Sequence, residues 1–206
     1  MKIYLCARED DLFNAWKTYT QQFDFVEATK QAIMYINADA IVSPANSFGF
    51  MTGGIDLHYI NYFGKEIAEE VRHKIVSEFN GELCVGQAMS VKLKSGDITK
   101  YKHLIVAPTM RVPENVGHTI NAFLAAKAAL IEANKLDDVE SIVFPGLGTG
   151  TGTMRPDDCA KQVAEAIKYV LIDEIPYTGV EDLYQEQDFV RKKIASSRWF
   201  EVQRMY

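Results

Sequence analysis

The segment that decides the fold runs from residue 141 to residue 158 and reads SIVFPGLGTGTGTMRPDD. Its first four residues form a short apolar run, typical of a strand buried on both faces of a parallel sheet. Its last three, Pro156-Asp157-Asp158, are typical of a helix start, because proline fits the first turn and carboxylates suit the positive end of a helix. Between them, glycine occupies every second position from 146 to 152. The segment therefore predicts a strand, a glycine-rich loop and a helix.

The glycine-rich loop has the composition of an anion cradle. Glycine lets the backbone approach a ligand closely, and successive N–H groups can converge on an anion, aided by the dipole of the helix that follows. Threonine hydroxyls at alternate positions add hydrogen-bond donors. A strand-to-helix turn without a ligand rarely needs alternating glycines. The loop thus predicts phosphate binding by Gly148, Thr149, Gly150, Thr151 and Gly152.

Two common nucleotide-binding patterns do not fit this loop. A Rossmann loop follows the first strand and is accompanied by an acidic residue after the next strand, whereas this loop lies late in the chain. A P-loop closes with Gly-Lys-Ser or Gly-Lys-Thr, which is absent here.

A second loop also leaves a buried apolar strand, at 40–42, and enters a helix near Asp56; residues 43–56 read SPANSFGFMTGGID. Asn46 offers a donor and an acceptor, either for a sugar hydroxyl or for its own loop. Gly53 and Gly54 allow close approach of a second phosphate oxygen. Asp56 suits a helix cap, a catalytic carboxylate, or both.

The remaining pattern alternates short apolar runs with helical periodicity. We expect strands at 3–6, 23–28, 40–42, 88–93, 103–107 and 141–144, a turn at 94–97, and helices at about 11–19, 56–78 in pieces, 119–134 and 156–171. Such alternation predicts a three-layer α/β/α fold around a mixed, largely parallel sheet of about six strands. Ligands of such folds bind at the carboxyl ends of the strands. Since both loops leave carboxyl ends, we expect them to form one site.

The chain is expected to form a single domain over residues 1–206. Residues 1–22 read as an additional N-terminal strand–helix unit, and residues 174–206 as a C-terminal extension packed on the domain, with a short helix at 182–191. Neither an internal repeat nor a linker divides the chain.

Composition restricts the partners. The formal net charge of −6 argues against a broad nucleic-acid surface, which needs clustered lysine and arginine. Three widely spaced cysteines form no zinc pattern and predict reduced thiols, so neither a metal nor another cofactor is expected. The N-terminus does not read as a signal peptide, and no apolar run approaches the roughly 20 residues that span a bilayer. These features predict a cytoplasmic protein without a membrane partner; they do not indicate an oligomeric state.

At the two loops the sequence resembles the macrodomain family. The first loop of that family runs Val-Asn-Ala-Ala-Asn, a glycine run and Val-Asp-Gly, and is matched here by Val42-Ser43-Pro44-Ala45-Asn46 and Gly53-Gly54-Ile55-Asp56. The second runs Pro-Ala-Ile-Ser-Thr-Gly and is matched by residues 145–150. The resemblance covers roughly residues 23–171.

The resemblance implies ADP-ribose or an ADP-ribosylated substrate as the ligand. Asn46 then contacts the distal ribose, and Ala45 is among the residues that bind the ligand. Gly53, Gly54 and Ile55 share the diphosphate with the cradle at 148–152. Asp56 corresponds to the aspartate proposed to activate or orient water near the anomeric carbon in hydrolytic members.

The acidic residue that contacts adenine in the family lies in a Gly-Asp-Ile turn after the second strand. Residues 96–99 copy those letters but follow the Asn46 loop, so we interpret them as a hairpin turn. By chain order, Glu27 in the segment 26–29 is the adenine candidate.

Departures from the family pattern leave two functions open. Ser43 replaces the first asparagine of the motif, Leu57 replaces the glycine after the aspartate, and Gly152 stands where hydrolytic members often carry an aromatic residue. One function is hydrolysis of ADP-ribosyl linkages or of ADP-ribose 1″-phosphate, carried by Asn46 and Asp56. The alternative is a non-catalytic reader or sensor of ADP-ribose or a related nucleotide.

Overall fold

The protein is described by a computed structural model over residues 1–93, 100–172 and 179–185. Six strands form one sheet in the order β2-β1-β6-β3-β5-β4. β4 runs antiparallel to β5, and every other neighbouring pair is parallel. The strands are β1 (Lys2–Cys6), β2 (Val26–Thr29), β3 (Ala40–Ser43), β4 (Met89–Lys92), β5 (His103–Val106) and β6 (Ser141–Phe144). The predicted mixed, largely parallel sheet is confirmed.

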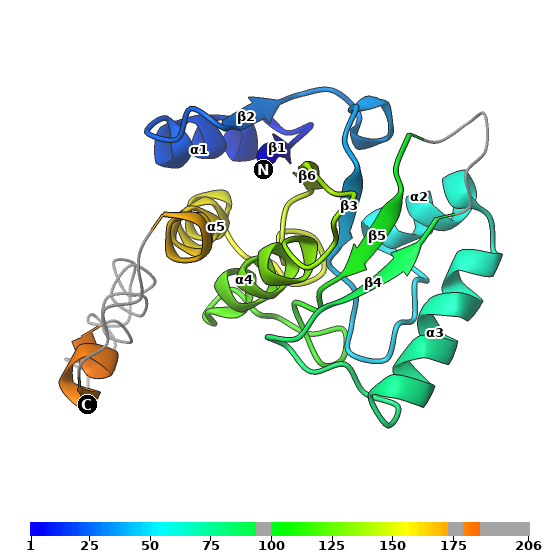
Figure 1. The fold of residues 1–206 in the computed structure, drawn as a ribbon. Helices are drawn as coiled ribbons and strands as arrows, with labels where there is room; N and C mark the ends of the chain where they lie inside the picture. Colours follow the sequence, from blue (N-terminus) through cyan, green and yellow to red (C-terminus); the bar gives the residue numbers. More distant parts are fainter. Residues whose placement is uncertain (94–99, 173–178, 186–206) are drawn as a thin grey trace.

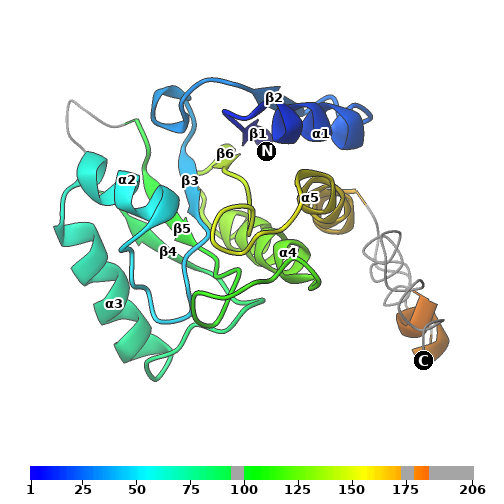
Figure 2. The same ribbon diagram turned by 180° about the vertical axis from the view of Figure 1, so that it is seen from behind.

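Helices cover both faces of the sheet and complete the predicted three layers (Figures 1 and 2). One face carries α1 (Asp10–Thr20), α4 (Asn121–Ala133) and α5 (Pro156–Leu171), and the other carries α2 (Gly54–Phe63) and α3 (Glu66–Glu78). A short 3-10 helix, η1 (Ile33–Tyr35), packs on the α2–α3 side. Each face has its own hydrophobic core because successive strand residues point to opposite faces. Val42 belongs to the α4–α5 core and Ile41 to the α2–α3 core.

Most element boundaries agree with the sequence pattern, and the differences have local causes. The helix expected in pieces over 56–78 divides at Gly64, whose φ of 98° is a left-handed conformation that ends α2. β2 begins at Val26 rather than Phe23, because the amide of Val26 donates to the Phe23 carbonyl in a turn. The turn expected at 94–97 lies outside the described residues. In the C-terminal part, residues 180–185 are helical and the rest of the expected helix at 182–191 is not described.

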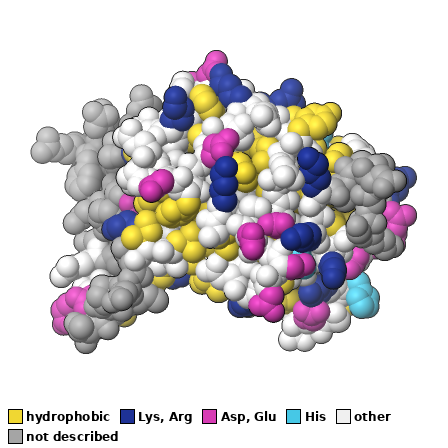
Figure 3. All heavy atoms as spheres, turned by 45° about the horizontal axis from the view of Figure 1, so that its top comes forward, with side chains coloured by type: hydrophobic (Ala, Val, Ile, Leu, Met, Phe, Trp, Pro, Cys, Tyr) yellow, Lys and Arg dark blue, Asp and Glu magenta, His cyan; other side chains and the backbone are white. Residues whose placement is uncertain are grey.

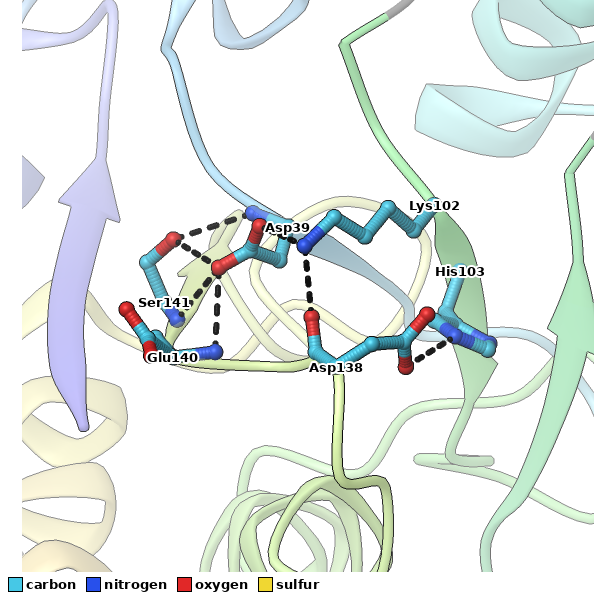
Figure 4. Close-up of polar contacts among 6 residues, drawn as sticks. All are labelled: Asp39, Lys102, His103, Asp138, Glu140 and Ser141. Atoms are coloured by element: carbon cyan, nitrogen blue, oxygen red, sulfur yellow. Dashed lines mark hydrogen bonds and ion pairs between the residues drawn. The ribbon is translucent and has the colours of Figure 1, made fainter. Parts of the chain in front are cut away.

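An ion-paired cluster joins three strands at the end of the sheet opposite the carboxyl ends (Figure 4). One carboxylate oxygen of Asp39 accepts hydrogen bonds from the amides of Glu140 and Ser141 and from the Ser141 hydroxyl. The other oxygen lies 2.7 Å from the ammonium group of Lys102. Burial alone raises the pKa of Asp39, but Lys102 and these hydrogen bonds outweigh it and lower the pKa below the ordinary 3.8. The cluster ties β3, β5 and β6 in register at their starts.

We expect Asp39→Ala to lower the free energy of unfolding by about 2 to 4 kcal/mol at pH 7, because two amides lose a charged acceptor. A carboxyl group with a lowered pKa stabilises the folded state above its unfolded pKa and ceases to do so as the pH falls through its folded pKa. The deficit should therefore shrink below about pH 4. Urea denaturation measures it, with exposed Asp24→Ala as the control. Equal stability of wild type and Asp39→Ala at pH 7 would refute the role of the cluster.

Acidic and basic side chains are interspersed on the face shown in Figure 3. Within the described ranges, no helix has the length and apolar character needed to cross a membrane. No group of three or more His, Cys, Asp or Glu side chains in the same ranges could hold a metal ion.

Candidate ligand-binding cleft

A cleft of about 640 Å³ opens where β1, β3, β5 and β6 end. Its volume lies within the range of small-molecule sites, roughly 300 to 1,000 Å³. The loops after these four strands contribute to it, and so does the first turn of α2. Eleven of the twelve residues predicted to bind or act on a ligand line it, namely Ala45, Asn46, Gly53, Gly54, Ile55, Asp56, Gly148, Thr149, Gly150, Thr151 and Gly152.

The glycine-rich loop is folded so that its amides remain available. Gly148 accepts a hydrogen bond from the Met154 amide, and Gly150 accepts one from the Thr153 amide. Among the described residues, no carbonyl accepts a hydrogen bond from the amides of residues 148–152. Backbone amides near a cleft that lack an internal acceptor are suited to bind an anion.

The glycines of this loop serve two different purposes. A Cβ atom at Gly152 would lie 2.5 Å from the Gly148 carbonyl oxygen and 2.6 Å from Val116 Cγ2, so packing within the loop excludes a side chain there. This contact also explains why no aromatic residue occupies position 152. A Cβ atom at Gly150 meets no atom within 4 Å, and the same holds at Gly53 and Gly54. The protein does not fill the space beside these three glycines, which leaves it free for a ligand.

The helix whose N-terminus faces the cleft is α2, not α5. Gly53 is the N-cap of α2 and provides no side chain, and the first helical hydrogen bond joins the Leu57 amide to the Gly53 carbonyl. The amides of residues 54–56 thus precede the first bond of the helix, where its positive end attracts anions. The first turn of α5 is absent from the cleft lining, which corrects the expectation that the helix after the glycine-rich loop aids binding. The physical cause is the tight turn at residues 150–154, which separates the loop from α5.

Asn46 shapes its own loop as well as lining the cleft. Its Nδ2 donates to the Phe50 carbonyl at 2.8 Å, and its Oδ1 accepts from the amides of Phe48 and Phe50 at 3.1 and 3.3 Å. Of the two interpretations of the sequence, loop stabilisation is therefore visible directly. One N–H of the Nδ2 group remains for a ligand, since a primary amide has two donors.

Asp56 lines the cleft and is buried. Its side chain projects from the first turn of α2, and Oδ1 accepts a hydrogen bond from Ser43 Oγ at 2.6 Å. The residue is 7% exposed. Burial raises the pKa of the carboxyl group to about 6, while the hydrogen bond from Ser43 acts in the opposite direction. A carboxyl group with this pKa can exchange a proton near neutral pH. Ser43, noted as a departure from the family motif, is the partner that orients it.

We expect Ser43→Ala to shift the titration midpoint of Asp56 above 6, because the variant removes the hydrogen bond that favours the carboxylate. The carboxyl carbon resonance of Asp56, followed by NMR from pH 4 to 9, reports this midpoint. The Ser90→Ala variant on β4 is the control and should leave it unchanged. A midpoint that does not move in Ser43→Ala would show that the hydrogen bond does not tune Asp56.

The placement predicted for Glu27 is wrong. Glu27 lies in the middle of β2 opposite Tyr4 of β1, whereas the cleft opens beyond the ends of the strands. Its exposed carboxylate pairs with Lys2 at 2.9 Å. Arg111, which follows β5, also lies outside the cleft lining and pairs with Glu82 at 2.8 Å.

Part of the cleft was not anticipated from the sequence. Arg8 and Glu9 after β1, Leu12 of α1 and Ile33 of η1 line one end, and Thr109, Met110 and Pro113 after β5 line another side. The sequence pattern could have indicated these residues. β1 and β5 run parallel to the strands between them, so the loops that follow them lie at the same edge of the sheet.

Comparison with known sequences assigns the family. The sequence model of the Macro domain matches residues 42–163, more than half of the chain. A protein of Aquifex aeolicus is 32% identical over 143 residues, covering 69% of this chain and 81% of its own. A protein of Aeropyrum pernix is 33% identical over 131 residues, covering 64% of each chain. The protein therefore belongs to the macrodomain family, as the two loops indicated.

Solved structures confirm the fold. A point mutant of the Oceanobacillus iheyensis macrodomain with ADPR superposes with a TM-score of 0.59 and 18% identity, covering 81% of this chain and 91% of its own. The macrodomain of Mycobacterium tuberculosis DarG gives a TM-score of 0.58 at 20% identity, covering 68% of this chain and 88% of its own. Another structure of the Oceanobacillus protein contains ADP and gives a TM-score of 0.58 at 19% identity, with coverage of 79% and 90%.

Proposed function

We propose that this macrodomain binds ADP-ribose, or the ADP-ribosyl group of a modified substrate, in the cleft at the carboxyl ends of β1, β3, β5 and β6. The observation that carries the proposal is the presence of two sets of backbone N–H groups on segments that line the cleft. One set belongs to residues 148–152 and the other to the first turn of α2. A diphosphate needs many donors, and here the backbone supplies them without a net positive charge. The ADP-ribose and ADP held by structures of similar fold support the choice of ligand.

The proposal also assigns an orientation to the ligand along the cleft. Asn46 and Asp56 both follow β3, so the distal ribose occupies the β3 end of the cleft, near the free N–H of Asn46. The diphosphate then spans the middle, between Gly53-Gly54 and the glycine-rich loop. Ala45, buried at the start of its loop, supplies a wall for the distal ribose.

Isothermal titration calorimetry tests this binding. We expect one ADP-ribose per chain with a dissociation constant in the micromolar range, about −8 kcal/mol. Ribose 5-phosphate, which lacks the diphosphate and the nucleoside, is the matched control and should bind far more weakly. The absence of heat at millimolar ADP-ribose would refute the proposal.

Asp56 supports a second function, the hydrolysis of the bond at the anomeric carbon of the distal ribose. A buried carboxyl group that lines the cleft with a pKa of about 6 is largely a carboxylate at pH 7 and can accept a proton from water. Amides of the cradle would stabilise the negative charge that develops on the ligand. Release of ADP-ribose from mono-ADP-ribosylated protein, and of phosphate from ADP-ribose 1″-phosphate, are the assays. If the protein binds ADP-ribose and turns over neither compound, it is a reader.

A further inference from the structure

One end of the cleft is built from residues outside the segment that matches the family. Arg8, Glu9, Leu12 and Ile33 all line the cleft and all precede residue 42, where the match begins. They come from the loop after β1, from α1 and from η1. The N-terminal strand–helix unit therefore contributes directly to the site.

The sheet order shows which part of the ligand meets this end. β6 lies between β1 and β3, so the glycine-rich loop after β6 separates Arg8 from Asn46 and Asp56. If the diphosphate occupies the glycine-rich loop and the distal ribose lies at the β3 end, the adenosine half extends toward β1. This assignment rests on the proposed binding of ADP-ribose.

In the described part of the chain, the β1 end of the cleft combines apolar walls with one cation that makes no ion pair. Leu12 and Ile33 are buried and provide apolar surfaces on which a flat base can pack. Packing of a base on apolar side chains does not require a cation. The exposed Arg8 nevertheless lines the same end. Within residues 1–93, 100–172 and 179–185, no hydrogen bond or ion pair engages its guanidinium group. The guanidinium is therefore available for an anionic group of the ligand.

The neighbouring carboxylate of Glu9 does not neutralise Arg8. Glu9 is the N-cap residue of α1 and, like Arg8, lies at a bend of the chain between β1 and α1. No ion pair joins the two residues among the described contacts. Glu9 can accept hydrogen bonds from the exocyclic amine of a base or from ribose hydroxyls, while Arg8 remains free for an anion.

We propose that Arg8 binds a phosphate ester on the ribose of the adenosine half, so that the preferred ligand is an ADP-ribosyl compound phosphorylated at the 2′ or 3′ position. A guanidinium group presents a planar fork that matches phosphate in bidentate geometry. The shared chemistry of the two positions is a dianionic phosphate on a ribose carbon. A 2′-phosphate would come from a phosphorylated dinucleotide and a 3′-phosphate from a nucleotide end.

Calorimetry on the full chain tests the proposal with ADP-ribose and ADP-ribose 2′-phosphate. Competition by adenosine 2′,5′-bisphosphate and 3′,5′-bisphosphate, each compared with AMP, distinguishes the two positions. We expect at least one phosphorylated position to bind wild type about 10-fold or more tightly than its parent compound. In Arg8→Gln this advantage should disappear, so that phosphorylated and parent compounds bind the variant with affinities within about 2-fold of each other. Arg111→Gln, a guanidinium outside the cleft, is the matched control and should retain the advantage.

Two results would overturn the inference while leaving the proposed function intact. One is equal affinity of wild type for phosphorylated and parent compounds at both positions. The other is an equal loss of affinity for ADP-ribose and for ADP-ribose 2′-phosphate in Arg8→Gln, which would mean that Arg8 contacts the diphosphate. Failure of the proposed function gives a different pattern, because no compound in the series would then bind wild type.

Discussion

Gly150→Glu is expected to weaken ADP-ribose binding by at least about 100-fold without unfolding the protein. The two halves of this expectation have separate causes. A Cβ atom at position 150 meets no atom within 4 Å, so the substitution fits the folded loop. The carboxylate, however, enters the space predicted for the diphosphate. At a few ångströms, two like charges near a protein surface repel by about 4 kcal/mol.

Variants at the same loop separate charge, bulk and fold. Gly150→Gln has similar bulk without the charge and should lose less affinity than Gly150→Glu, while Gly150→Ala should remain close to wild type. Gly152→Ala should instead lose thermal stability, because its Cβ would lie 2.5 Å from the Gly148 carbonyl oxygen. Calorimetry and a thermal melt measure the two effects. Retention of wild-type affinity by Gly150→Glu would place the diphosphate elsewhere.

Asp56→Asn is expected to have opposite effects on activity and stability. The amide cannot accept a proton from water, so any hydrolysis should fall by about 100- to 10,000-fold. Affinity for ADP-ribose should persist, because the amide keeps the shape of the side chain and its Oδ1 can still accept from Ser43. In the wild type, the rate should rise with pH through about 6, as the carboxylate forms.

The stability effect of Asp56→Asn follows from the raised pKa. A carboxyl group with a pKa of 3.8 when unfolded and about 6 when folded binds more protons in the folded state between these values. Wild-type stability therefore decreases as the pH rises from about 4 to 6, and the cost above pH 6 is about 3 kcal/mol. The variant carries no such cost and should be more stable than wild type at pH 8 but not at pH 4.

Urea denaturation at pH 4, 6 and 8 measures this difference, and Asp157→Asn is the control because it replaces an aspartate in a first helical turn outside the cleft. A constant difference between Asp56→Asn and wild type at all three values would show that the Asp56 carboxyl is not buried as described. Unchanged hydrolysis in Asp56→Asn would exclude it as the base.

The sequence predicted the parts of the molecule where local pattern and tertiary structure agree. β6 and α5 have the predicted bounds, because a continuous apolar run and a proline-led helix start are strong local signals. The two loops were predicted to share a site because parallel strands bring their carboxyl ends to one edge. The same rule applied to β1 would have indicated Arg8 and Glu9.

Other features depend on contacts that no local pattern encodes. Glu27 was predicted to contact adenine because of its order in the chain. In the structure it lies within β2 rather than beyond the end of the strand, and it does not line the cleft. The helix dipole was assigned to α5 because α5 follows the glycines, whereas the turn at 150–154 separates the loop from α5 and the first turn of α2 lines the cleft instead. The pairing of Ser43 with Asp56 joins residues 13 apart across a loop and becomes visible only in three dimensions.

The most direct test of the central claim is the change in backbone amide resonances on titration with ADP-ribose. If the diphosphate binds to the backbone amides of the glycine-rich loop and of the first turn of α2, the largest chemical-shift changes should fall on Gly54, Ile55 and residues 148–152. Smaller changes are expected at Ala45 and Asn46. The amides of α3 and β4, which lie outside the cleft, should not respond. Shifts concentrated away from both loops, or none at saturating ligand, would contradict the claim.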